Sequence, residues 1–229
     1  MPKDPGNGRP LDYPPSEKTQ VKRLHERARY DRESAHAILD AGLLCHVGYV
    51  IDGQPYVTPT AYWREGDWIY WHGSSASKML RKVKEGVPVC LTVAMLDGLV
   101  LARSGFHSSV NYRSLMAFGE AELVEEEAEK IRSLDSFIDR LTPGRAAEVR
   151  PPTSQEMKAT TVLRMKLSEV AMKIRNGPPA DDEEDYALDV WAGVVPIRTV
   201  IEAPEDDPRL KAGVAAPGYL DEIRINRLD

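Results

Sequence analysis

Residues 43–63, "LLCHVGYVIDGQPYVTPTAYW", are the stretch that decides the fold. Two runs rich in Val, Tyr, Ile and Thr flank the pair Asp52-Gly53, and an Asp-Gly pair between such runs is a strong signal for a tight hairpin turn. The stretch therefore predicts a strand over 43–51, a turn, and a second strand over 54–63.

The segments on either side of the hairpin continue the pattern of short elements. Before it, Asp31 can cap a helix over 32–41, which Gly42 would end. After it, a short turn leads to a strand over 67–72, and a basic helix over 76–85 follows.

The rest of the chain predicts more strands than helices. The expected elements are a pair of strands around Asp97-Gly98, a long strand over 111–124 with a bulge at Gly119, an acidic amphipathic helix over 125–141, a link over 151–160, one or two strands within 161–174, and a loop with a short helix within 178–193. Six or seven closely spaced strands with two or three peripheral helices indicate a mainly antiparallel β-barrel. A Rossmann fold is not expected, because strands and helices do not alternate and neither a GxGxxG nor a P-loop motif is present.

Length and composition set the organisation and the class of protein. The chain has 229 residues, which suits one large domain with arms or, at the limit, two small domains. We expect an N-terminal arm over 1–29, a barrel domain over 30–197 and a polar C-terminal tail over 198–229.

Charge and hydropathy exclude several classes of partner. A net charge of −6 and a pI near 5.5 argue against a broad basic face for nucleic acid. No apolar stretch approaches the roughly 18–20 residues of a membrane span, and the polar, Pro-rich N-terminus lacks the apolar core of a signal peptide. We therefore expect a cytoplasmic protein that binds neither nucleic acid nor membrane.

No metal site is expected. Cys45 and Cys90 are the only cysteines, and they lie in apolar runs without a CxxC spacing or a matching His pair, so reduced thiols are the simplest interpretation. The run "DDEEDY" at 181–186 is best read as a solvated helix start, because sites for hard cations generally need ligands from separate segments.

Residues 68–80, "WIYWHGSSASKML", pass from a bulky strand into a turn of small residues and then into a basic helix. The N–H groups at a helix start, the serine hydroxyls, and the charges of Lys78 and Arg81 would together suit a phosphate group. Ordinary capping by serine explains the same residues without any ligand. The residues alone leave both interpretations open.

Three further features are candidates on chemistry alone. Arg113 begins a long strand among polar neighbours, where it is either a ligand contact or a solvated side chain. Pro59 cannot donate a ladder hydrogen bond, so its strand is locally an edge or faces a flat ligand. His72 lies at the mouth of the phosphate-like turn, and His46 and His107 are weaker candidates for a cofactor role.

Four segments together resemble one family. In chain order, "GLLCHVGYVIDGQPYVTPTAYW", "IYWHGSSASKMLR", "VNYRSLMAFGEAELV" and "KIRNGPPADDEEDYALDVWAGVVP" are similar to the pyridoxamine 5′-phosphate oxidase-like flavin-nucleotide-binding proteins. More narrowly, they resemble the branch that includes the nitroimidazole-resistance proteins. The likeness covers about residues 30–200, and the order of the four segments is more specific than any one of them.

The resemblance implies a split β-barrel homodimer that holds two FMN molecules at the subunit interface. It also implies a set of contacts to each FMN. These are Val57, Thr58, Pro59 and Thr60 along the isoalloxazine ring; His72, Gly73, Ser74, Ser77 and Lys78 at the ribityl phosphate; Asn111, Tyr112, Arg113 and Ser114 as flavin or phosphate contacts, often across the dimer; and Trp191 as a wall near the ring.

The sequence departs from true pyridoxamine-phosphate oxidases in two places. Lys78 is followed by Met79 rather than by a second cation, and the chain ends in "IRINRLD" rather than in the Arg-Leu-x-Pro ending that serves the pyridoxal substrate. Pyridoxamine phosphate is therefore not the expected substrate.

The expected function is that of an FMN-dependent oxidoreductase acting on a small acceptor such as a nitro-aromatic, and no residue is assigned as a general base. Two alternatives remain open. One is a non-catalytic flavin carrier or sensor. The other is a split barrel with a different cofactor, either a deazaflavin or a haem ligated by His46, His72 or His107.

Overall fold

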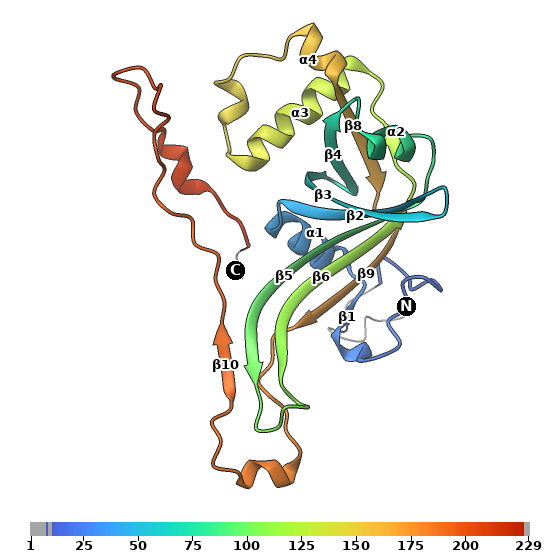
Figure 1. Cartoon of the computed structure of the whole chain (residues 1–229), viewed down its shortest axis with the longest axis vertical. Helices are drawn as coiled ribbons and strands as arrows, with labels where there is room; N and C mark the ends of the chain where they lie inside the picture. The colour runs from blue at the N-terminus through green and yellow to red at the C-terminus, as the bar shows by residue number, and fades with distance from the viewer. Residues whose placement is uncertain (1–7, 9–10, 227–229) are drawn as a thin grey trace.

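The computed structural model of the chain describes residue 8 and residues 11–226 (Figure 1). The outermost parts of the expected N-terminal arm and C-terminal tail, residues 1–7, 9–10 and 227–229, lie outside the described residues.

Strands dominate the described part of the chain. They are β1 (Ala28–Arg29), β2 (Leu44–Ile51), β3 (Gln54–Glu65), β4 (Trp68–Ser74), β5 (Val89–Leu101), β6 (Ser109–Gly119), β7 (Glu122–Leu123), β8 (Thr160–Lys166), β9 (Glu169–Arg175) and β10 (Gly193–Pro196). The helices are α1 (Arg32–Ala41), α2 (Lys78–Val83), α3 (Glu127–Leu141) and α4 (Ser154–Ala159), with short 3-10 turns η1 (His25–Arg27), η2 (Arg145–Ala147), η3 (Glu183–Ala187) and η4 (Gly218–Glu222).

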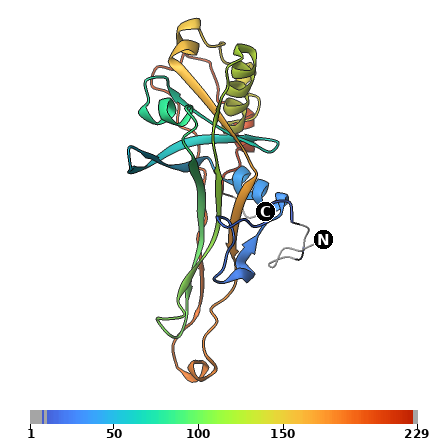
Figure 2. The ribbon, with the colours of Figure 1, turned by 90° about the vertical axis from the view of Figure 1, so that its right-hand side faces the viewer.

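All strand pairs in the described residues are antiparallel. The sheet runs in the order β1-β9-β6-β5-β2-β3-β4-β8-β7, and β10 pairs with β5. Seven of these strands are at least seven residues long. The sheet curls, so that β2 and β3 cross the molecule while β5, β6 and β9 descend from them (Figures 1 and 2). The predicted mainly antiparallel split barrel of six to seven principal strands is confirmed.

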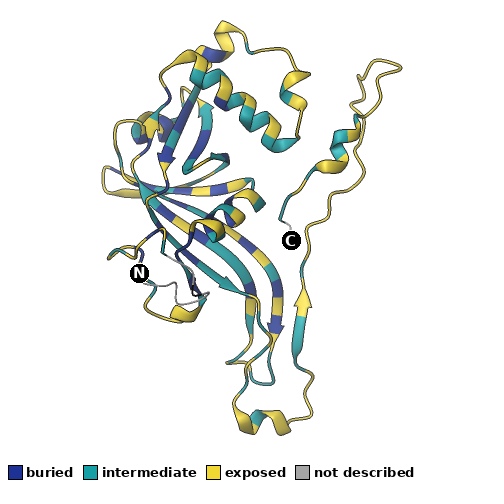
Figure 3. Ribbon diagram, turned by 180° about the vertical axis from the view of Figure 1, so that it is seen from behind, coloured by how far each residue is buried: buried dark blue, intermediate teal, exposed yellow. Residues whose placement is uncertain are grey.

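The barrel core follows from the alternation of side chains along each strand. On β2 the residues Cys45, Val47, Tyr49 and Ile51 are buried, and the residues between them are exposed or half-buried (Figure 3). A second, smaller cluster of Trp63, Tyr70, Val124 and Val162 lies where α3 packs on the sheet, against Leu134 and Phe137. A period of two residues is what one buried sheet face requires.

Helix α1 has the boundaries that the sequence predicted. The Asp31 carboxylate accepts a hydrogen bond from the Ser34 N–H at 2.9 Å, and Gly42 follows the last turn. The Tyr62 hydroxyl donates to the carbonyl of Leu39 at 2.7 Å, and a Cβ at Gly42 would lie 2.7 Å from that hydroxyl. Glycine is therefore needed where α1 approaches β3.

The predicted pair of strands around Asp97-Gly98 is wrong. Residues 89–101 form one strand, β5, with a register shift between Leu96 and Gly98. The carbonyl of Asp97 accepts from the Ile197 N–H at 3.0 Å, and a Cβ at Gly98 would lie 3.1 Å from the carbonyl oxygen of Val195. Gly98 thus allows β10 to approach, and the chain does not turn there.

Two smaller expectations are also corrected. Gly119 ends β6 and is not a bulge within a longer strand. The expected link over 151–160 contains α4, which begins with a capping box formed by Thr153 and Glu156. The S/T-x-x-E pattern was present in the sequence as a local signal for that helix.

The described part of the N-terminal arm lies on the barrel. Tyr13 is buried, its N–H donates to the carbonyl of Tyr30 at 2.9 Å, and β1 pairs with β9. By contrast, residues 198–216 form an exposed strap without helix or strand (Figure 3). Within the described residues, no helix combines the length and apolar composition needed to cross a membrane.

Candidate functional site

The turn after β4 uses many of its own hydrogen-bonding groups. The Ser74 Oγ accepts from the Ala76 N–H at 3.2 Å, and the Ser74 carbonyl accepts from the Ser77 N–H at 2.9 Å. The Ser77 Oγ caps α2 by accepting from the Leu80 N–H at 3.4 Å. A Cβ at Gly73 would lie 3.0 Å from Leu80 Cδ1, so glycine lets α2 pack against β4. Within the chain, the hydrogen bonds of this turn are therefore those of ordinary serine capping.

Lys78 joins this turn to β3. Its Nζ donates to the Tyr56 hydroxyl at 3.1 Å and lies 4.7 Å from the centre of the Tyr56 ring. Tyr56 stacks on Tyr49 with ring centres 5.5 Å apart, and the Tyr49 hydroxyl is 3.0 Å from Thr58 Oγ1. The hydrogen bond to Tyr56 raises the pKa of Lys78, so its charge is retained at neutral pH. A cation with a hydrogen-bonded, stacked support therefore lies beside the start of β3.

The four β3 residues assigned to the flavin ring divide between two faces. Thr58 and Thr60 lie opposite the buried residues Val47 and Cys45 and so face inward. Val57, which is 67% exposed, and Pro59 point to the opposite side. Only alternate members of this run can contact one ligand through their side chains.

The side of the sheet that carries Val57 is exposed and largely apolar. We call it the outer face, defined by Leu44, His46, Gly48, Val50, Val57, Pro59, Cys90, Thr92, Met116 and Phe118, which are joined by the strand registers. A groove of about 820 Å³ crosses it, with Gly48, Val57, Cys90 and Phe118 in its lining. An open apolar surface of this kind suits a flat aromatic ring or a second protein surface.

His72 does not point toward the turn that follows it. Its ring lies 4.8 Å from the ring of Phe137 and 5.8 Å from that of Trp63, between β4 and α3. The buried Nδ1 atom has no hydrogen-bond partner in the described part of the chain. Burial lowers the pKa of His72, so the imidazole is neutral at pH 7. A neutral imidazole is the form that ligates metals.

The run Asn111 to Ser114 also divides between two faces. Asn111 is buried and accepts from the guanidinium of Arg175, while Arg113 pairs with Asp97 through N–O distances of 2.9 and 2.8 Å. These side chains lie on the inner face, and Tyr112 and Ser114 alternate with them. The structure thus groups Asn111 and Arg113 with each other, apart from the Lys78 turn.

Trp191 lies far from the other predicted contacts within one chain. Its side chain is two-thirds exposed, and its ring covers Gly193 at the start of β10. Figure 1 shows β10 at the opposite end of the molecule from α2. For Trp191 to wall the predicted ring site, a second copy of the chain would have to supply it.

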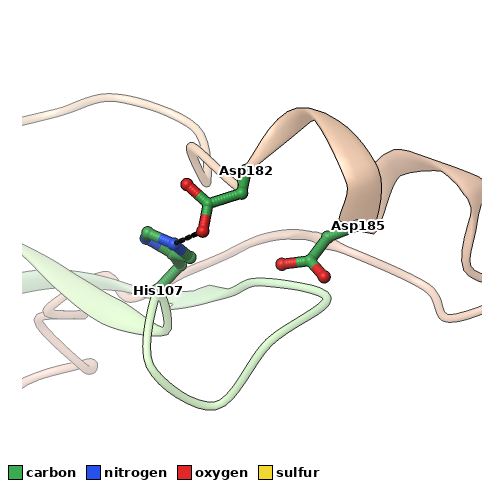
Figure 4. Close-up of side chains that lie close together, drawn as sticks. All are labelled: His107, Asp182 and Asp185. Carbon is green, nitrogen blue, oxygen red and sulfur yellow. Dashed lines mark hydrogen bonds and ion pairs between the residues drawn. The ribbon is translucent and has the colours of Figure 1, made fainter.

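The acidic run at 181–186 meets a histidine from another segment. His107 Nε2 is 3.2 Å from Asp182 Oδ2, and ligand atoms of His107, Asp182 and Asp185 lie within 4.8 Å of one another (Figure 4). This convergence was not foreseen from the sequence. Exposed acidic groups commonly gather without an ion, so we do not assign a metal to them.

Comparison with known proteins identifies the family. The family model described as pyridoxamine 5′-phosphate oxidase matches residues 31–174, which include the barrel strands β2 to β8. This chain belongs to that family. No curated protein matches the sequence.

Solved structures in and around the family are similar to this chain. The flavocytochrome Anf3 from Azotobacter vinelandii is 46% identical over 98% of this chain and 100% of its own, with a TM-score of 0.89. The FAD and heme binding protein from Mycobacterium smegmatis is 38% identical over 87% of this chain and 98% of its own, with a TM-score of 0.83. A proposed 5-nitroimidazole antibiotic resistance protein from Bacteroides thetaiotaomicron, at 22% identity over 64% of this chain and 86% of its own, has a TM-score of 0.53 and shows the fold alone.

Besides the His107 cluster, sequence reasoning missed two features of this family member. The Tyr49–Tyr56 stack that supports Lys78 was signalled only by aromatic residues at equal distances from the Asp52-Gly53 turn. Arg175, which binds the Asn111 amide, lies in a strand and had no local signal at all.

Acid should destabilise the protein partly through His72. In the unfolded chain a histidine has a pKa of about 6.5, whereas burial lowers the pKa of His72 in the folded state. The unfolded state therefore binds the proton first, and stability falls as pH drops below about 6.5 toward the folded-state pKa. His72→Gln should lose less free energy of unfolding than the wild type between about pH 7 and about pH 5, measured by urea denaturation.

The control for this experiment is His25→Gln, because His25 is an exposed histidine on η1 and is not part of the outer face. This variant should lose as much stability as the wild type over the same pH range. If the wild type and His72→Gln lost the same free energy of unfolding, His72 would not be a source of the pH dependence.

Proposed function

We propose that this chain binds a flavin nucleotide and acts as a redox protein. The observation that carries the proposal is its similarity to the flavocytochrome Anf3, which extends over 98% of this chain at 46% identity. The match therefore includes the arms as well as the barrel.

The residues of one chain fit the two ends of a flavin nucleotide. The exposed hydroxyls of Ser74 and Ser75 and the ammonium of Lys78 offer donors and charge for a phosphate. The apolar outer face around Val57 and Pro59 offers a flat surface for the ring. When bound, the flavin would supply hydride and one-electron transfer, while the protein supplies its binding and orientation.

We further propose that the bound flavin is FMN. The family resemblance implies FMN, whereas the Mycobacterium smegmatis relative is named as an FAD and heme binding protein. Chromatography of the flavin released from purified protein distinguishes FMN from FAD, and FMN is the predicted result.

Haem is the second cofactor that we propose. Two similar proteins, at 46% and 38% identity, are named as a flavocytochrome and as an FAD and heme binding protein. His72 is the best candidate ligand here, because its neutral imidazole lies among the apolar rings of Trp63 and Phe137 and lacks a hydrogen-bond partner in the described residues.

An absorption spectrum of freshly purified protein tests both cofactors. Flavin bands together with a Soret band are expected, and His72→Ala should abolish the Soret band while leaving the flavin bands. His107→Ala should keep both, and His46→Ala should keep the Soret band. A spectrum without flavin bands would contradict the main proposal, and a Soret band that survives in His72→Ala would place the haem ligand elsewhere.

Oxidoreductase activity on a small acceptor such as a nitro-aromatic remains part of the proposal. Reduction of the purified protein by NAD(P)H or dithionite, followed by reoxidation with the acceptor, would support it. A coloured protein that no acceptor reoxidises would favour the non-catalytic carrier or sensor.

Lys78→Ala should weaken flavin binding. A charge-assisted hydrogen bond to a phosphate would be lost, at a cost of about 1–3 kcal/mol in binding free energy. Titration of flavin into cofactor-free protein, followed by fluorescence quenching, measures the change. Lys84→Ala, a substitution at the other end of α2, should bind as the wild type does, and an unchanged affinity in Lys78→Ala would move the phosphate to another part of the chain.

We also propose that the protein is a homodimer with the flavin at the interface. The outer face exposes Leu44, Val50 and Val57 to solvent by more than half of their surfaces, and a second copy related by a two-fold axis would cover them. Val57→Asp should convert the dimer to a monomer in sedimentation analysis, because it buries an unpaired charge. Val200→Asp, on the exposed strap, is the control, and a monomeric wild type would contradict the proposal.

A further inference from the structure

A small pocket is lined by residues of β5, β6, β9 and β10 and of the segments that follow β9 and β10. Its volume is about 260 Å³. Its polar lining is dominated by cations, with Arg113 from β6, Arg175 from β9 and Arg198 just after β10, against the single carboxylate of Asp97.

The carboxylate of Asp97 is already used by Arg113. The two side chains form a two-point ion pair with N–O distances of 2.9 and 2.8 Å, and each is only 12% exposed. This pair is neutral as a unit. The charges of the other two arginines are therefore not balanced by Asp97.

Arg175 makes hydrogen bonds only to neutral acceptors in the described part of the chain. Its Nη1 donates to the Asn111 side chain and to the Gly177 carbonyl at 3.0 Å, and its Nη2 donates to the Pro178 carbonyl at 2.9 Å. Burial, and then repulsion from Arg27, lowers the pKa of Arg175. The guanidinium nevertheless stays charged at neutral pH, and no carboxylate of the described residues is bonded to it.

Arg198 adds a second charge of the same sign. Its only hydrogen bond among the described residues runs from Nη1 to the carbonyl of its neighbour Ile197 at 3.1 Å. The apolar side chains of Ile174, Val194 and Pro196 complete the walls. Apolar walls reduce solvent screening and strengthen the attraction between these arginines and an anion.

We propose that this pocket binds a small oxyanion, a phosphate or carboxylate group, between Arg175 and Arg198. Guanidinium groups recognise such oxygens through paired N–H donors. The volume lies below the roughly 300–1,000 Å³ typical of sites for larger organic ligands, so one acidic group fits better than a ring system. That group is either a free small anion or the acidic end of a larger bound cofactor.

The oxyanion pocket is separate from the proposed flavin-phosphate site at Lys78. The pocket is lined by residues of β5, β6, β9 and β10, whereas Lys78 belongs to α2, which lies well above β10 in Figure 1 and lines no part of the pocket. A purified protein without flavin would contradict the proposed redox function and would still allow the pocket to be tested.

The test is calorimetric titration of the purified protein with inorganic phosphate at low ionic strength. Arg175→Gln and Arg198→Gln should each weaken binding by about tenfold or more, because each removes a charge-assisted hydrogen bond. Arg209→Gln is the control, since it makes the same change of charge on the exposed strap. Arg198 is itself exposed, so its variant tests the pocket even if Arg175→Gln unfolds.

The outcomes separate the two sources of the anion. Phosphate binding that both pocket variants lose and Arg209→Gln keeps supports a free small anion. If the purified wild type takes up no phosphate, the pocket variants should retain less bound flavin or haem per chain than Arg209→Gln does, which supports a cofactor-borne anion. Equal phosphate binding in all four proteins, or no phosphate binding with equal cofactor content, overturns the proposal.

Discussion

The double pairing of β2, with β3 on one edge and β5 on the other, is the constraint on which the rest of the structure depends. Its register buries Cys45, Val47, Tyr49 and Ile51. A slip by one residue would expose all four and turn His46 toward the core instead. Because each buried aliphatic or aromatic side chain contributes about 1.5–3 kcal/mol, such a slip would cost several kcal/mol. The fixed register also decides which residues form the outer face.

Charge is distributed unevenly over this frame. The chain carries a net charge of −6, which repels nucleic acids and other large anions at a distance. Two places nevertheless carry cations that have no carboxylate partner among the described residues and lie beside apolar surface: the Lys78 turn at the end of β4, and the pocket of Arg175 and Arg198 at the end of β9. The apolar outer face lies on β2, β3, β5 and β6. Such an arrangement favours ligands that combine an apolar body with a small acidic group.

Local signals predicted the elements whose conformation is decided locally. Asp52 and Gly53 both have positive φ, as a two-residue type I′ hairpin turn requires, and the Asp31 cap is satisfied by a residue three positions away. The same Asp-Gly dipeptide at 97–98 failed as a turn signal because its partners are distant in sequence. Asp97 pairs with Arg113, and Gly98 makes room for β10.

The candidate site was harder to predict for the same reason. Serine capping of α2 could be read from the sequence, but the support of Lys78 by Tyr56 depends on how β3 and β4 pair. The cluster of His107 with Asp182 and the pocket of Arg175 and Arg198 each need segments that lie far apart in the chain. Residue types indicated which chemistry to expect, and the sheet topology decided which residues meet.

The pleat of β6 limits how many residues of a continuous sequence motif can contact one ligand. Four consecutive residues, Asn111 to Ser114, were assigned to one flavin by resemblance, yet successive side chains of a strand point to opposite faces. Asn111 and Arg113 serve the inner face, where they meet Arg175 and Asp97. Tyr112 and Ser114 lie opposite Leu96 and Ala94 on the other face. A ligand on either face can therefore contact only half of the motif through side chains. The other half must contact a different ligand or pack against another part of the protein.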